Sequence, residues 1–484
     1  MSNTSLVHNA FYNMMYRILG IIFPVITASY VARILFPEGV GRINVAQNNV
    51  SYFVMIISLG IQTYGIREIA KCNNSIEKRS LLFKELVILN ECCTLISLMV
   101  FTILLFLFPL FYNDFLLYSI CGLAIVVNFF NFDWLYKGLE DYKYITVRSF
   151  WIKTLSLLLT FLFVKNETDI YKYALIQVFS VGGNYIFNLL NISKLVSFNN
   201  TRINITKHFR PLVFLTLCIF STELYSRIDI TMLGIMSNNV SVGYYTSAQR
   251  IVNIVMTLLV SSTYVLFPRL SELYQKDTQR FCSLVTNGTN LMIILTIPAC
   301  IGLILIGKLV TTILFGAAFT AASISLQILS LIIPLRCIAD ITGYQIMLCA
   351  GQENRLAKTY FGIMLANISM NYLLIPNFKE IGASVASVIS EALAFIIVFA
   401  MARQIVHISL NKLDFLKTIL CAVTMGIVVF IISNNVENMY ISLLLCMIVG
   451  SGTFIAGCRL LRNSTYIELR RILLGTLLKA GKRE

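Results

Sequence analysis

Long apolar stretches separated by short polar loops dominate this sequence. Fourteen of them approach the roughly 20 residues that a helix needs to cross a bilayer. They lie near residues 11–32, 45–66, 86–110, 115–136, 146–164, 171–193, 211–236, 243–267, 284–306, 323–349, 359–377, 381–402, 414–433 and 438–459. A transmembrane β-barrel would instead show alternating apolar and polar residues. The pattern predicts an all-α polytopic membrane protein with about 14 transmembrane helices.

The composition supports a membrane protein and gives no sign of a metal or cofactor. Hydrophobic residues make up 57% and charged residues 13% of the chain, whereas soluble domains carry about 25% charged residues. Most of the 12 cysteines fall in apolar segments, which is typical of small buried side chains. The three histidines His8, His208 and His407 are scattered and have no Cys-x-x-Cys pair nearby. No metal site is therefore predicted.

The loops between these stretches alternate in charge. Twenty-seven Lys and Arg residues fall in the loops of one side and in the C-terminal tail, and six fall on the other side. Cytoplasmic loops carry the positive excess, so both termini are expected in the cytoplasm, where the basic face meets anionic lipid. This even spread over every second loop disfavours a nucleic-acid surface. The first apolar segment lacks a basic n-region and is expected to remain as an uncleaved span.

Two short sequences recur at matching places along the chain. VGRINVAQ at residues 40–47 runs into the second predicted span, and VGYYTSAQ at residues 242–249 runs into the eighth. A weaker echo, GLED at 138–141 and GQEN at 351–354, precedes spans five and eleven. We expect two six-helix lobes related by a pseudo-two-fold axis along the membrane normal. The predicted lobes are residues 1–196 and 197–405, followed by a helix pair and basic tail at 406–484.

Several charged residues fall inside the predicted spans. A charge at the centre of the bilayer costs at least about 2.5–3.5 kcal/mol, so it usually faces a partner or a cavity. Arg227 and Arg336 could each pair on one helix face with an acid four residues away, Glu223 and Asp340 respectively. Arg17 has no opposite charge within one turn, which favours a water-filled cavity. Glu391 is open to two interpretations, a buried hydrogen-bonded carboxyl or a protonatable coupling group.

Signatures of enzymes are missing. GLILIGKL at residues 302–309 resembles part of a phosphate-binding loop, but Leu309 replaces the required Ser or Thr. The sequence has no His-Glu-x-x-His motif, and each outside loop is too short for a large extracytoplasmic catalytic segment. We therefore predict that the chain is not an enzyme.

Four segments, at residues 29–71, 227–251, 266–274 and 371–391, resemble the Wzx-type O-antigen flippases of the multidrug/oligosaccharidyl-lipid/polysaccharide exporter superfamily. SYVARILFPEGVGRINVAQNNVSYFVMIISLGIQTYGIREIAK at 29–71 is similar to the first two helices of that family. RIDITMLGIMSNNVSVGYYTSAQRI at 227–251, with LFPRLSELY at 266–274, looks like the start of its second half. NYLLIPNFKEIGASVASVISE at 371–391 looks like its spans eleven and twelve. Phe36 departs from the family, which usually has Gly there, and many relatives have twelve spans.

The resemblance implies a two-lobed flippase of the inner membrane that needs no cofactor and works by alternating access. The cargo would be an oligosaccharide on undecaprenyl diphosphate, and its diphosphate suits guanidinium groups. The residues expected to bind this headgroup are Arg17, Arg227, Arg250 and Arg336. The acids expected to orient them or carry a coupling proton are Asp229, Asp340 and Glu391. A polysaccharide polymerase and a chain-length regulator are further partners that the family suggests, beside membrane lipids.

Two other functions remain open at this point. A cation-coupled exporter of small toxic molecules would share the architecture, although it would favour an anionic cavity, and here basic residues stand beside the acids. A membrane-embedded polysaccharide polymerase or ligase belongs to a different class. Both the short outside loops and the repeated sequences, which indicate two lobes, argue against such an enzyme.

Overall fold

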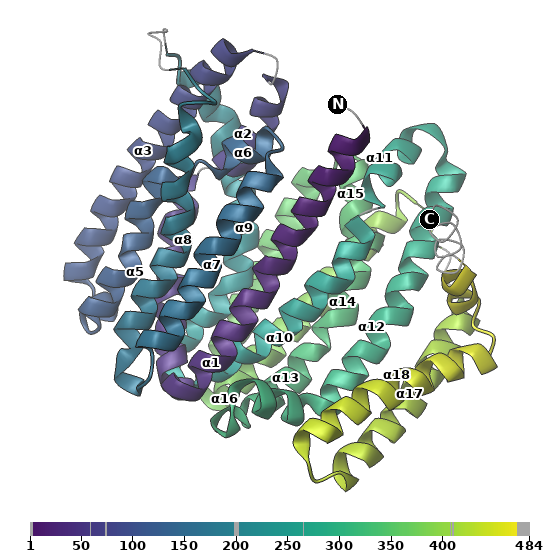
Figure 1. Cartoon of the computed structure of the whole chain (residues 1–484). Helices are drawn as coiled ribbons and strands as arrows, with labels where there is room; N and C mark the ends of the chain where they lie inside the picture. The colour runs from purple at the N-terminus through teal and green to yellow at the C-terminus, as the bar shows by residue number, and fades with distance from the viewer. Residues whose placement is uncertain are drawn as a thin grey trace. The chain divides into compact units, whose positions relative to one another are not determined.

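The computed structural model describes residues 3–58, 60–72, 75–197, 203–264, 266–406, 408 and 411–471. This part of the chain is helical and contains no strand (Figure 1). The longer elements are α1 (Asn3–Ser58), α2 (Ile61–Lys71), α3 (Ile76–Leu107), α5 (Phe115–Val127), α7 (Tyr142–Phe163), α8 (Ile170–Ile192), α9 (Thr206–Met236), α10 (Asn239–Tyr264), α11 (Phe267–Lys276), α12 (Thr278–Phe315), α13 (Ala322–Ser330), α14 (Ile332–Ala339), α16 (Glu353–Arg403), α17 (Lys412–Asn435) and α18 (Met439–Leu460). The shorter ones are α4 (Pro109–Tyr112), η1 (Asn128–Phe130), α6 (Asp133–Gly138), η2 (Glu167–Asp169), η3 (Ala317–Phe319), η4 (Asp340–Tyr344) and α15 (Gln345–Cys349).

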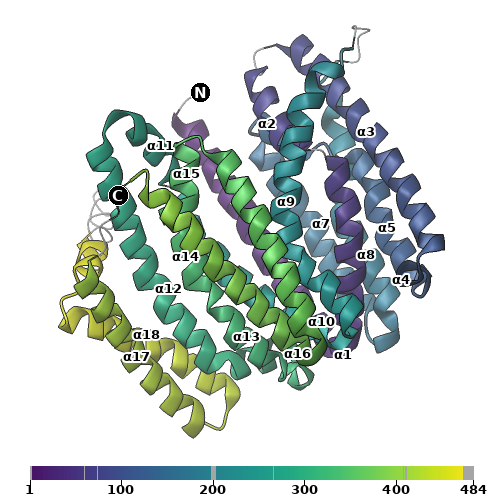
Figure 2. The same cartoon turned by 180° about the vertical axis from the view of Figure 1, so that it is seen from behind.

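The helices form two compact units. The first comprises Met1–Gly234 and Asn238–Gly243, and the second comprises Ile235–Ser237 and Tyr244–Glu484. Within the first unit, α7 packs on α1 and α8, and α5 packs on α8. Within the second unit, α17 and α18 form a hairpin against α12, visible in yellow in Figure 2. The predicted division into 1–196, 197–405 and 406–484 stays a prediction.

The helices agree with the predicted class of membrane protein. Among the described residues, nine helices are long and apolar enough to cross a membrane. The all-α polytopic fold is therefore confirmed, whereas the number of fourteen spans and the pseudo-two-fold axis stay predictions. His407 and the end of the basic tail, 472–484, lie outside the described residues.

Two of the long helices each contain a sharp break that separates two predicted spans. In α1 the break is at Phe36 (φ 54°, ψ 176°), and in α16 it is at Lys379 (φ 48°, ψ −127°). Gly316 (φ 94°, ψ 170°) ends α12 in a conformation similar to that of Phe36. Such positive-φ conformations suit glycine and cost another residue about 1–3 kcal/mol. The structure thus gives a physical reason why a glycine would suit the position of Phe36.

Two predicted spans are divided further. Span four, expected as one helix over 115–136, is built from α5, η1 and α6 because polar side chains interrupt it at Asn128, Asn131 and Asp133. Span ten, expected over 323–349, consists of α13, α14, the π-helical η4 and α15. A π-turn inserted in a helix frequently marks a functional site.

The glycines of the two VG….AQ sequences, Gly41 and Gly243, lie where two stretches of backbone come very close together. Gly41 lies so close to the start of α10 that a Cβ atom would be 1.7 Å from the carbonyl oxygen of Asn239 and 2.8 Å from the nitrogen of Gly243. A Cβ on Gly243 would in turn be 2.1 Å from the carbonyl oxygen of Pro37. All of these atoms belong to the first unit. The two glycines therefore allow two backbones to touch where any side chain would force them apart.

We predict that Gly41→Ala destabilises the folded protein by about 1–3 kcal/mol, because its methyl group would overlap backbone rather than a side chain that can move. Gly302→Ala is the matched control, since no atom lies within 4 Å of a Cβ at this position in α12. The control should be neutral or more stable by about 0.5–1 kcal/mol. Thermal unfolding of both purified variants measures the difference, and equal midpoints would contradict the close contact.

Replacing Phe36 with glycine should have the opposite effect. Phe36→Gly removes the strain of a positive φ and should raise the free energy of unfolding by about 1 kcal/mol. The midpoint of thermal unfolding should rise accordingly. Glu38→Gly, two residues on in the regular helix, should lower it because glycine weakens a helix interior. A fall in the midpoint of both variants would show that Phe36 is held by side-chain packing and not strained.

Candidate functional site

Arg17 lies on the N-terminal half of α1, in the first unit. Its side chain is exposed, and its Nε donates a long hydrogen bond of 3.5 Å to Asn13 one turn earlier. The neighbouring Tyr16 faces Lys153 of α7, whose Nζ is 6.0 Å from the ring centroid. The same Nζ would be 4.0 Å from a Cβ atom on Gly20. Lys153 thus lies against the stretch of α1 that contains Tyr16 and Gly20.

Arg227 forms the ion pair that its i,i+4 spacing allows. Its Nε is 3.0 Å from Oε2 of Glu223, and the two side chains are 40% and 43% exposed. The backbone here is tied to α1, because Asn48 Nδ2 donates to the carbonyl of Arg227 at 3.4 Å and to Thr231 Oγ1 at 2.8 Å. Asp229, two residues beyond Arg227, is buried. The structure therefore places Arg227 and Asp229 on a segment of α9 held by polar contacts to α1.

Arg336 pairs across helices in the second unit. Its Nη1 is 3.3 Å from Oε1 of Glu391 on α16, and its side chain is 48% exposed while that of Glu391 is 9% exposed. Asp340, the partner expected from the i,i+4 spacing, begins the π-helical turn and accepts hydrogen bonds from Gln345 Nε2 (2.7 Å) and Thr263 Oγ1 (3.3 Å). Glu391 thus connects α16 to α14 through the guanidinium of Arg336.

The predicted site residues divide between the units. Arg17, Arg227 and Asp229 belong to the first, and Arg250, Arg336, Asp340 and Glu391 belong to the second. Arg250 is half-buried on α10 and forms no ion pair in the part of the chain that the structure describes. The structure brings Arg336 together with Glu391, and the assignment of all seven residues to one binding site stays a prediction.

A buried polar cluster that the sequence did not reveal connects α6, α7 and α8 in the first unit. Arg148 Nη2 is 3.0 Å from Asp133 Oδ1, and the side chains are 3% and 12% exposed. Asn188 donates to the same carboxylate oxygen at 3.0 Å and accepts from Arg148. Asp133 falls in the predicted span 115–136 and Arg148 at the start of the predicted span 146–164, so only folding shows that they form a pair.

A second cluster joins α2, α3 and the start of α9. Glu85 is fully buried, and its carboxylate receives Lys207 Nζ at 2.8 Å and His208 Nε2 at 2.9 Å. Tyr64 hydroxyl lies 2.8 Å from the other ring nitrogen of His208. Lys207 and His208 are both distant from Glu85 in sequence, and no local spacing indicates the contact. Because each group has a partner, this cluster is well suited to anchor α9 to α3.

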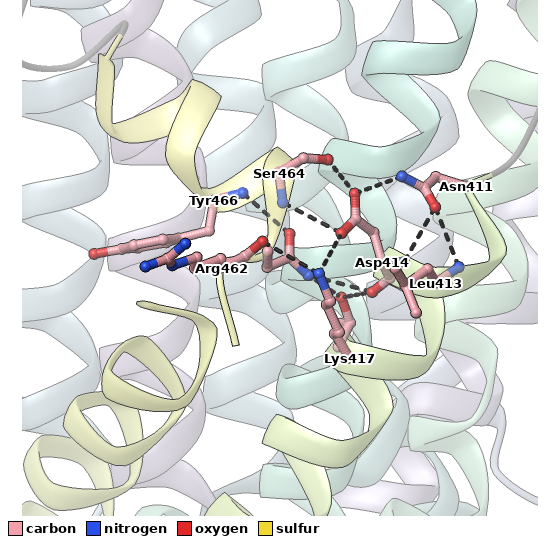
Figure 3. Close-up of polar contacts among 9 residues, drawn as sticks. Asn411, Leu413, Asp414, Lys417, Arg462, Ser464 and Tyr466 are labelled. Carbon is pink, nitrogen blue, oxygen red and sulfur yellow. Dashed lines mark hydrogen bonds and ion pairs between the residues drawn. The ribbon is translucent and has the colours of Figure 1, made fainter. Parts of the chain in front are cut away.

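A third cluster fixes the turn that follows α18 (Figure 3). Asp414, near the start of α17, accepts from the backbone nitrogen of Ser464 at 3.2 Å and from its hydroxyl. Asn411 donates to Asp414 at 2.8 Å, and Lys417 donates to the carbonyl of Arg462 at 3.3 Å. The carboxylate therefore sits at the beginning of the helical residues 464–471, where backbone N–H groups favour a negative charge.

Two family models match the chain, each over more than half of its length. The model described as polysaccharide biosynthesis protein matches residues 6–274. The chain belongs to this family. The model of the lipid II flippase MurJ matches residues 151–450, which extends the likeness into α18. The predicted membership of the Wzx-type flippases and of their exporter superfamily is confirmed.

Individual proteins that are similar to this chain have names that agree with the two family models. A protein of Escherichia coli (strain K12) named "Putative O-antigen transporter" is 24% identical over 410 residues, covering 83% of this chain and 97% of the relative. The "Probable low-salt glycan biosynthesis flippase Agl15" of Haloferax volcanii is 30% identical over 169 residues, covering 35% of this chain and 36% of the relative. The solved structure of lipid II flippase MurJ in an inward closed conformation has the same fold, with a TM-score of 0.73, 14% identity and coverage of 94% and 98%.

These relatives decide the class of protein. They are transporters and flippases, so the prediction that the chain is not an enzyme is confirmed, and a polymerase or ligase is excluded. The apolar helices and the relatives together make this polysaccharide biosynthesis protein a multi-pass protein of the inner membrane.

Removing one partner of the Asp133–Arg148 pair should strongly lower the free energy of unfolding of this protein. We expect Arg148→Met to cost about 3–5 kcal/mol, because it leaves a buried carboxylate uncompensated. The double variant Arg148→Met with Asp133→Leu should lose less than the sum of the single variants, since both charges are then gone. Thermal unfolding followed by size-exclusion chromatography measures all three, and strict additivity would show that the pair does not interact.

Proposed function

We propose that the chain moves undecaprenyl-diphosphate-linked oligosaccharide repeat units from the cytoplasmic to the outer leaflet by alternating access. The repeat units would supply O-antigen or another surface polysaccharide. Membership of the polysaccharide biosynthesis family supports this function, and the near full-length likeness to a relative named for O-antigen transport supports the cargo class. In this proposal both termini lie in the cytoplasm, as the distribution of Lys and Arg favours.

The intramembrane arginines give the proposal its chemistry. Such a cargo has a diphosphate that must cross the hydrocarbon, and a guanidinium group holds phosphate oxygens at two points. Arg336 is the arginine best prepared for this role, because Glu391 holds it while nearly half of its side chain stays exposed. Arg17, Arg227 and Arg250 are assigned the same role, each exposed or half-buried on its helix.

The acids are assigned to orientation and coupling. Glu391 orients Arg336. The Glu391 carboxylate would be released when a phosphate of the cargo binds the guanidinium group in its place. Asp340 begins the π-helical turn, four residues after Arg336, and accepts hydrogen bonds from Gln345 and Thr263. Asp229 is buried near the Glu223–Arg227 pair. Each of the three acids is a candidate for the coupling proton, and a polymerase or chain-length regulator would act on the product after release.

The proposal predicts the effect of deleting the gene. Surface polysaccharide should disappear while lipid-linked repeat units accumulate on the cytoplasmic leaflet, which protection from a membrane-impermeant glycan label detects. Normal surface polysaccharide in the deletion strain would contradict the function. Hypersensitivity to cationic drugs without any change in polysaccharide would indicate the multidrug exporter instead.

Complementation of that strain tests Arg336. Arg336→Ala should reduce export by on the order of tenfold or more at a normal protein level, because a hydrogen bond to a charged group contributes about 1.5–3 kcal/mol. Arg336→Lys should retain part of the activity, since lysine keeps the charge but not the planar fork. Arg280→Ala is the control, because that side chain is 79% exposed and pairs with Asp277, three residues earlier at the start of α12. Equal export by all variants would remove Arg336 from the site.

A further inference from the structure

The segment that connects α8 to α9 is bound to the first turns of α3. Arg79 Nε donates to the carbonyl of Leu195 at 2.9 Å. The backbone nitrogen of Ser197 donates to Ser80 Oγ at 2.9 Å, and the two serine hydroxyl oxygens are 3.3 Å apart. Arg79 and Ser80 are both buried on α3. The chain that leaves α8 therefore stays in contact with the first unit.

The beginning of α9 is held by the same helix and by an apolar core. Glu85 Oε1 accepts from the backbone nitrogen of Asn204 at 2.9 Å, in addition to the contacts of this carboxylate with Lys207 and His208. Leu212 is 1% exposed and belongs to a buried apolar cluster formed mainly by residues of α2, α3 and α6. A buried carboxylate that loses its partners is costly. This end of α9 is therefore firmly attached to α3.

The far end of α9 is attached to α1. Thr231 Oγ1 accepts from Asn48 Nδ2 at 2.8 Å and is 2.8 Å from the hydroxyl oxygen of Tyr52. A Cβ atom on Gly234 would be 3.0 Å from Val45 Cγ2 and 3.7 Å from Val45 Cβ. All five of these residues belong to the first unit. Hydrogen bonds and close packing thus join α1 to the last turns of α9.

These two attachments lie far apart along one helix. From His208 to Thr231 the axis of α9 extends about 35 Å at 1.5 Å per residue, which exceeds the roughly 30 Å of a bilayer's hydrocarbon core. A helix that is fixed at both ends cannot tilt away from its neighbours or slide along them without breaking one set of contacts. The contacts at Glu85 and at Thr231 therefore make α9 a rigid part of the first unit.

We propose that α9 moves with the first unit throughout the transport cycle, so that the moving junction lies after α9, between Gly234 and Tyr244. The inference rests on the proposed function, because alternating access requires units that move. The chain changes units after Gly234 and not between α8 and α9. The predicted boundary at residues 196 and 197 would instead let α9 move with the second unit. The two boundaries make opposite predictions for a covalent link between α9 and α1.

A disulfide between α1 and α9 tests the proposal in cells of the deletion strain. The Cβ separation of 3.7 Å between positions 45 and 234 falls within the range of about 3.5–4.5 Å that disulfides require. Val45→Cys with Gly234→Cys is oxidised with copper phenanthroline, and loss of labelling by a maleimide–polyethylene glycol measures the cross-link. Export of new surface polysaccharide should stay within about twofold of that in reduced cells, because rigid-body motion of the unit leaves this contact intact.

A second pair tests the other end of α9. Ser80→Cys with Ser197→Cys links α3 to the connecting segment, where the serine oxygens are 3.3 Å apart. Cysteine is close to serine in size, so this pair keeps the test decisive if a side chain at position 234 lowers the protein level. Export after oxidation should again stay within about twofold. The controls are the four single-cysteine variants, which cannot form the engineered disulfides and report any effect of the oxidant on other proteins.

The outcomes separate the proposal from the proposed function. Sustained export by the cross-linked variants assigns α9 to the first unit. A loss of export of about tenfold or more on oxidation, reversed by dithiothreitol and absent from the single-cysteine variants, would show that α9 leaves the first unit and would overturn the proposal. Failure of both pairs to cross-link would overturn it as well. If the wild-type chain does not restore polysaccharide to the deletion strain, the proposed function falls, and the transport cycle falls with it.

Discussion

A charged side chain among apolar helices must find a partner, and this requirement shapes the interior of both units. In the first unit, Asp133, Arg148 and Asn188 satisfy one another between α6, α7 and α8. Glu85 contacts Lys207 and His208 at the start of α9. In the second unit, Arg336 and Glu391 connect α14 to α16. A buried ion pair adds little net stability compared with apolar packing, but breaking one is costly. The pairs therefore fix which helices are neighbours more than they raise the stability.

The charged side chains among the helices differ in how completely their partners enclose them. Arg148 is almost completely enclosed by its partners, whereas Arg336 remains half exposed beside Glu391. Lys153 goes further, with a tyrosine ring in place of a carboxylate. A protein that binds an anion for only part of its cycle needs cations that are incompletely neutralised. Arg148 lacks that property because Asp133 and Asn188 enclose it, whereas Lys153 forms no ion pair among the described residues.

The sequence predicted the class of fold well because hydrophobic length is a local property. The apolar stretches identified α3, α7, α8, α12, α17 and α18 without any knowledge of their neighbours. Spacing along one helix also predicted the Glu223–Arg227 pair. Contacts between helices carry no such local signal, which is why Asp340 looked like the partner of Arg336 although the pair at 3.3 Å is with Glu391. The interruption of span four was missed for a related reason. In a hydropathy average over the span, its apolar residues outweigh the polar side chains at 128, 131 and 133.

The contact between Gly41 and Gly243 has a consequence for building hybrids of related proteins. The two positions are 202 residues apart, yet each is shaped by the backbone of the other's segment. A chimaera that takes residues 36–47 from one parent and 237–249 from another would combine two backbone segments that did not evolve to fit each other. Crossover points that keep these two stretches from the same parent should give functional hybrids far more often than crossovers that split them.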